Sequence, residues 1–139
     1  MSQVYGIWAL RVGASLHLVQ LPATLALGVL ARRHGLQTRI PVFVQRALGV
    51  IGGGIVLAVL WGALWCWLLP DALLGTPFGV MFTSGWLMFW GYRLAAQIFV
   101  YGPWVPSNYR WAHYLLIGVF SLKTACFACA TQSAWLAFR

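Results

Sequence analysis

Four apolar stretches, each about 20 residues long, follow one another along this chain, and a helix of that length spans the roughly 30 Å hydrocarbon core of a bilayer. Charged residues make up 7% of the chain, against roughly 25% in a water-soluble domain, so they cannot cover its surface in water. We therefore predict an all-α integral membrane protein, a bundle of four transmembrane helices with short loops that forms a single domain over residues 1–139. The expected helices are residues 7–31, 47–69, 78–101 and 111–130.

Basic residues are concentrated in the first of the three predicted loops. That loop holds Arg32, Arg33, Arg39 and Arg46, whereas the second loop, PDALLGTPFG, holds no Lys or Arg and the third holds Arg110. Basic loops stay on the cytoplasmic side of a membrane. We therefore expect a multi-pass protein of a bacterial inner membrane with both termini on the non-cytoplasmic side. Topology then explains the net charge of +8, and we expect no nucleic-acid partner.

Carboxylates are almost absent, which restricts the possible chemistry. The chain has no glutamate, and its one acidic residue, Asp71, directly follows Pro70. Paired-carboxylate hydrolysis, HExxH zinc chemistry and carboxylate-driven proton antiport all lack their residues. Small drug exporters and the membrane glutathione-dependent four-helix family both depend on a glutamate, so both are disfavoured. We predict no catalytic residue and no metal site of these kinds.

His17, within the first expected helix, is the candidate ligand of a haem or of a chlorophyll-type pigment. Gly13, one turn earlier, would leave space for a macrocycle, and in these two residues the helix resembles those of light-harvesting proteins. A rise of 1.5 Å per residue puts His113 roughly 10 Å from the depth of His17, which disfavours a bis-histidine haem. The interpretation that we favour is a histidine bonded to a neighbouring helix.

The three cysteines are expected in the outer half of the bundle. Cys126 and Cys129 form a CxxC motif beside Lys123, and Cys66 lies near the end of the second helix. A CxxC pair next to a cation can be reactive, as in a thiol–quinone oxidoreductase. Because the pair lies in an apolar helix, we favour cysteines that act as small buried apolar residues. A structural Cys66–Cys129 disulfide is the third interpretation.

The second expected helix is rich in small residues. Gly49 and Gly53 form a GxxxG pair, and Gly54, Ala58 and Gly62 make a stripe on another face. Small residues let helix backbones approach closely in lipid. We expect packing within the chain at this helix.

Arg93 interrupts the third apolar stretch, about 12 Å from its inner boundary. Gln97 lies one turn further along, with Trp86 and Trp90 on the same face. An arginine at mid-helix costs about 3 kcal/mol or more. The one acid, Asp71, is expected at the opposite boundary, so relief for Arg93 must come from another kind of partner.

Lys123 is a second cation at membrane depth, expected near the level of His17. We predict that Arg93, Gln97, Lys123, Trp86 and Trp90 contact lipid phosphate, a quinone carbonyl or a carboxylate of another integral membrane subunit. The predicted function is a small, non-catalytic accessory subunit of a larger membrane complex that makes lateral contacts with helices, membrane lipids or cofactors. The alternative is an electron-transport protein that uses the CxxC pair or His17.

Overall fold

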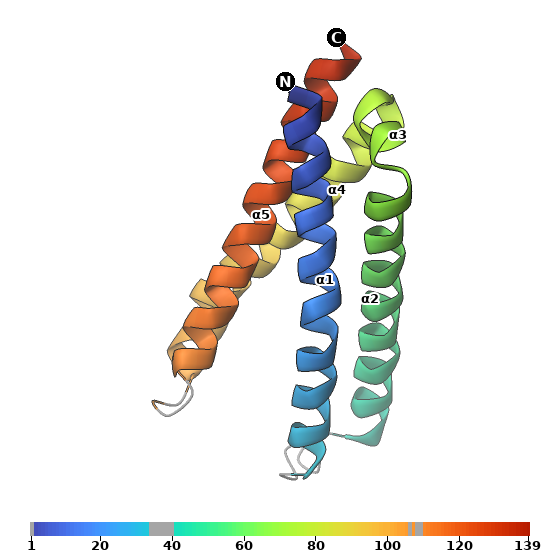
Figure 1. Cartoon of the computed structure of the whole chain (residues 1–139). Helices are drawn as coiled ribbons and strands as arrows, with labels where there is room; N and C mark the ends of the chain where they lie inside the picture. Colours follow the sequence, from blue (N-terminus) through green and yellow to red (C-terminus); the bar gives the residue numbers. More distant parts are fainter. Residues whose placement is uncertain (1, 34–40, 106, 108–109) are drawn as a thin grey trace.

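The computed structural model describes residues 2–33, 41–105, 107 and 110–139, and these are almost entirely helical (Figure 1). The described part contains no strand, and the prediction of an all-α fold is confirmed. In chain order the α-helices are α1 (Ser2–Arg33), α2 (Val42–Leu68), α3 (Pro70–Gly75), α4 (Pro77–Ala95) and α5 (Arg110–Phe138). A π-helix, η1 (Ala96–Tyr101), and a 3-10 turn, η2 (Gly102–Trp104), continue α4.

The long helices run alternately up and down, so both termini lie at one end of the molecule (Figure 1). The short helix α3 lies at that end as well, whereas the end of α1 and the starts of α2 and α5 lie at the other (Figure 1). The last helix, α5, packs against both α1 and α4, whereas α2 packs mainly against α1 and α3. The centre of the bundle is therefore built by α1, α4 and α5.

Several helix boundaries differ from those expected. Helix α1 begins at Ser2 and ends at Arg33, and α5 continues to Phe138 because no Gly or Pro follows residue 118 to stop it. Within the second loop, Pro70 and Asp71 begin the extra helix α3, since Pro suits a first helical position and an acid suits the positive end of a helix. Of the basic connector after α1, residues 42–46 belong to α2, and residues 34–40, with Arg39, lie outside the described residues.

Two helical segments in the described part are long and apolar enough to cross a membrane, Gly49–Leu68 and Arg110–Phe138. Helix α4 carries Arg93 and gives way to the π-helix after Ala95, and the described side chains of α1 include Arg11 and His17. Length and composition thus give weak support for membrane association. The four-span bundle stays a prediction.

Apolar side chains cover much of the outside of the described part, whereas several polar side chains lie inside. Val50, Met81 and Phe99 are each 75–78% exposed, on α2, α4 and η1. In contrast, Lys123 and His17 are fully buried. The buried polar residues are His17, Thr83, Gln97, Lys123 and Ser133.

Gly79 allows the first turn of α4 to pack directly on α3. A Cβ added at this position would overlap the backbone carbonyl of Leu73. The same turn is held by Thr76, whose Oγ1 accepts a hydrogen bond from Gly79 N at 3.2 Å and donates one to the Ala72 carbonyl at 2.7 Å. The sharp passage from α3 to α4 therefore requires a residue without a side chain here.

We expect Gly79→Ala to destabilise the fold by at least the about 1–3 kcal/mol that overpacking usually costs, because the overlapping atoms are backbone. Gly85→Ala is the matched control on α4, since a Cβ there would meet no heavy atom within 4 Å. The control should be neutral or slightly stabilising because alanine favours a helix. Thermal unfolding of the purified variants measures both effects, and equal Tm values would contradict the close approach.

Candidate functional site

An aromatic cluster surrounds His17 where α1, α4 and α5 meet. The centroid of the His17 ring lies 4.9 Å from that of Trp86, 5.0 Å from that of Trp90 and 5.6 Å from that of Phe127. Trp86 in turn stacks on Phe127, with 24° between the ring planes. Aromatic rings at these separations attract one another and exclude water. The cluster thus joins three helices around one buried imidazole.

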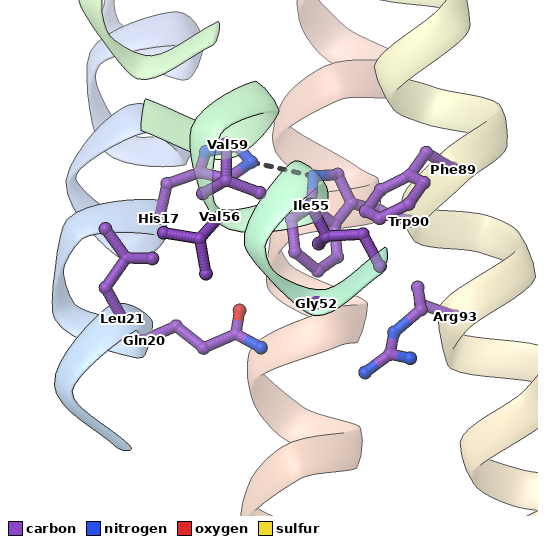
Figure 2. A pocket seen from close by; sticks show the side chains of 10 residues that line it. All are labelled: His17, Gln20, Leu21, Gly52, Ile55, Val56, Val59, Phe89, Trp90 and Arg93. Atoms are coloured by element: carbon purple, nitrogen blue, oxygen red, sulfur yellow. Dashed lines mark hydrogen bonds between the residues drawn. The ribbon is translucent and has the colours of Figure 1, made fainter. Parts of the chain in front are cut away.

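A hydrogen bond within this cluster fixes the state of the imidazole. Trp90 Nε1 donates to His17 Nε2 at 2.9 Å (Figure 2). An indole N–H can only donate, so Nε2 must be the accepting nitrogen and the ring proton lies on Nδ1. His17 is therefore a neutral imidazole bonded to a neighbouring helix.

The same contacts occupy the place where a pigment would bind. A metal bond to His17 Nε2 would have to replace Trp90, and the Phe127 ring lies 3.2 Å from where a Cβ of Gly13 would stand. The space beside Gly13 is thus filled by α5. No group of three or more His, Cys, Asp or Glu side chains that could hold a metal ion occurs among the described residues.

Lys123, on α5, has partners on two other helices. Its Nζ donates to Gln20 Oε1 on α1 and lies 3.8 Å from the centroid of the Trp90 ring on α4. A cation over an aromatic face is stabilised by about 2 kcal/mol or more when it is desolvated. Lys123 is therefore held by contacts within the chain, in addition to any contact outside it.

Arg93 is held much less completely. Its Cζ lies 5.5 Å from the centroid of the Phe120 ring, and its side chain is partly exposed. Within the part of the chain that the structure describes, its guanidinium makes no hydrogen bond and no ion pair. Asp71 lies on α3, beyond the other end of α4 (Figure 1). Arg93 is thus a cation with five N–H donors and one aromatic contact.

Gln97 and Arg93 have different partners. Its Nε2 lies 2.9 Å from Nδ1 of His113 on α5, and Gln97 is buried. A continuous α-helix would place residues 93 and 97 on one face. The π-helix that begins at Ala96 has a wider turn, which changes the direction of Gln97. The expected pair of Arg93 and Gln97 therefore does not form one binding group.

A cavity of about 220 Å³ lies between α1, α2 and α4 (Figure 2). Figure 2 shows the side chains of Gln20 and Arg93 pointing toward each other across one end of this cavity. Side chains of α2 form an apolar wall. The cavity thus has a polar end at Gln20 and Arg93, whereas the side formed by α2 is hydrocarbon. Its lining residues are His17, Gln20, Leu21, Gly52, Ile55, Val56, Val59, Phe89, Trp90 and Arg93.

The three cysteines are free. Cys66 is buried in the core, Cys126 is buried beside Gly13, and Cys129, three residues further along α5, is exposed. The disulfide considered between Cys66 and Cys129 is therefore not formed. The two thiols of the CxxC motif lie in different surroundings.

The sequence interpretation gave no role to Arg11, Phe120 or Phe127. Arg11 Nε is buried without a hydrogen bond in the described part, and Cζ lies 5.7 Å from the Trp67 ring centroid. Phe120, Lys123 and Phe127 follow the three- and four-residue spacing of one helix face. That spacing could have assigned both phenylalanines to the centre.

The chain was compared with protein-family models, curated proteins and solved structures, and none of them matches it. Its function is therefore argued from the site and its surroundings.

We expect Trp90→Phe to lower the free energy of unfolding by about 1–3 kcal/mol, because His17 Nε2 becomes a buried acceptor without a donor. His17→Leu should also destabilise, and the double variant should cost less than the sum, because neither polar partner then remains unpaired. Thermal unfolding of the four proteins of this cycle measures the coupling. A coupling energy near zero would contradict the role of the hydrogen bond.

Proposed function

We propose that the chain is a four-span integral membrane protein and works as a non-catalytic accessory subunit of a larger membrane complex. The observation that carries the proposal is the wide exposure of large apolar side chains. Val19 on α1, Leu57 on α2, Met88 on α4 and Leu115 on α5 are 60–75% exposed. Water-soluble monomers rarely expose contiguous apolar patches larger than a few hundred Å². Lipid and other subunits would cover these faces.

The charge distribution supports a topology with both termini on the non-cytoplasmic side. Both termini lie at the same end of the bundle, which fits an even number of crossings (Figure 1). Arg110 begins α5 and Arg46 lies in the first turns of α2, both toward the other end. Arg32 and Arg33 are the last two residues of α1, at that same end. Under the positive-inside rule, this end faces the cytoplasm.

The first half of α2 supports lateral contact with another helix. Added Cβ atoms at Gly49, Gly52, Gly53 and Gly54 would meet nothing within 4 Å. Gly62, in the second half, differs because Trp86 packs directly against it. A helix surface without side chains allows close approach of a second helix in lipid. Gly49 and Gly53, one turn apart, form an open glycine face of α2, and this is the surface that we assign to a neighbouring subunit.

The redox alternative has less support from the geometry. Of the two thiols of the CxxC motif on α5, Cys126 is buried and Cys129 is exposed. Cys66 is enclosed by the core. A thiol pair that exchanges electrons with a soluble partner must be reachable, and this arrangement offers one reachable sulfur.

The proposed topology predicts which kind of reporter is active at the C-terminus. A reporter that functions only outside the cytoplasm should be active when it is fused at Arg139, and a reporter that functions only in the cytoplasm should be inactive. The physical reason is the cost of moving the arginines of the first loop across the bilayer. Paired fusions to a periplasmic enzyme and to a cytoplasmic fluorescent protein measure this. Activity of the cytoplasmic reporter alone would overturn the proposed orientation.

Lateral contact at α2 predicts that Gly53→Leu reduces the yield of proteins that co-purify with the chain in mild detergent. A leucine fills the surface that the neighbouring helix would approach, and its Cβ meets no heavy atom within 4 Å in the described part of the chain. Gly118→Leu on α5, which is equally open, is the matched control and should leave the yield unchanged. Quantitative mass spectrometry of the purified material measures both. Unchanged partners in the Gly53 variant would exclude this face as the contact.

A further inference from the structure

We propose that the cavity between α1, α2 and α4 binds the oxyanion headgroup of an acidic membrane amphiphile, with Arg93 as its anchor. The headgroup is a phosphate or a carboxylate, and the hydrocarbon chain leaves between α2 and α4. This inference rests on the proposed membrane location, and it names a ligand for one site of the proposed subunit.

The polar end of the cavity offers hydrogen-bond donors, so a ligand bound there must supply an acceptor. Arg93 brings five N–H donors and no acceptor. The one histidine in the lining, His17, already accepts from Trp90 through Nε2. Gln20 Oε1 receives the hydrogen bond of Lys123, so it is already an engaged acceptor. A ligand that enters here meets the guanidinium donors of Arg93.

Charge favours an anion over a neutral carbonyl compound. Lys123 contacts the Trp90 ring, and Trp90 and Arg93 both line the cavity, so two basic side chains converge on one region. The single acid of the chain, Asp71, is exposed on α3. A cation within a bilayer is costly unless it is paired or reaches water. An oxyanion matches the planar fork of a guanidinium in both charge and geometry.

The dimensions of the cavity select a small headgroup with a tail. At about 220 Å³ it is smaller than the roughly 300–1,000 Å³ of pockets that enclose a whole drug-sized ligand. A phosphate or carboxylate group therefore fits, whereas a macrocycle does not. Gly52, Ile55 and Val56 line the side formed by α2, and Ile55 is 42% exposed. The backbone of α2 packs mainly against α1 and α3, and α4 reaches α2 through side chains such as Trp86 on Gly62. Near Gly52, further along α2, we place the lateral exit of the acyl chain.

The test measures binding to the delipidated full-length protein by native mass spectrometry and by thermal shift. The probes are phosphatidic acid beside diacylglycerol with the same chains, and oleate beside oleyl alcohol. We expect each acid to bind and to raise Tm, and each neutral counterpart to bind at least tenfold more weakly. Equal binding of acid and neutral members would overturn the proposal. Inorganic phosphate or a short-chain quinone that binds as tightly as the acidic amphiphiles would also overturn it.

Two variants address the site directly. Arg93→Met should weaken binding of phosphatidic acid at least tenfold, and Arg93→Lys should retain part of it because the charge remains without the fork. Gly52→Leu should also weaken binding, because its side chain enters the cavity where no atom stands within 4 Å of the added Cβ. Arg139→Met, at the chain end, is the control and should bind as wild type does. Wild-type affinity in both Arg93→Met and Gly52→Leu would exclude this cavity.

Failure of the lipid site can be separated from failure of the proposed function. Extraction of membranes with alkaline carbonate and the co-purification of partners report on the subunit role alone. A chain that resists extraction and keeps its partners, but binds acidic and neutral amphiphiles equally, would overturn only the headgroup site. A chain released by carbonate would overturn the membrane subunit and the lipid site with it.

Discussion

The hydrogen bond from Trp90 to His17 organises the centre of the bundle. It joins α4 to α1, it keeps the imidazole neutral, and it sets the plane of the indole ring. One face of that ring then supports the ammonium of Lys123 from α5. Three helices are therefore connected through one indole side chain. Loss of this donor would affect the histidine, the lysine and the packing of the helices that carry them.

A chain with a single acidic residue must satisfy its interior cations without ion pairs. Lys123 achieves this with an amide oxygen from Gln20 and with an aromatic face. Arg93 has one aromatic contact, with Phe120, and faces a cavity. We therefore assign a structural role to Lys123 and a binding role to Arg93. A cation that is already held stabilises the bundle, whereas one that retains free donors can recruit a ligand.

The exposed surface of the molecule also fits the proposed membrane subunit. Large apolar side chains are exposed on all four long helices, and the glycine face of α2 is open in its first half. Both features are unfavourable in water and become useful beside acyl chains or another helix. The proposed headgroup site would open toward the same surroundings. Lipid and partner subunits would then approach the bundle at neighbouring positions on α2.

The sequence by itself determined the all-α fold, the approximate position of each long helix and the burial of His17 and Lys123 among apolar residues. These properties follow from the apolar length of each stretch and from local hydrogen bonding, which depend on nearby residues. The tertiary structure decided the pairing. Trp90 reaches His17 across 73 residues, Lys123 reaches Gln20 across 103, and a π-helix directs Gln97 to His113. Such contacts depend on how the helices are rotated and spaced against one another, and that arrangement follows from the packing of all of them together.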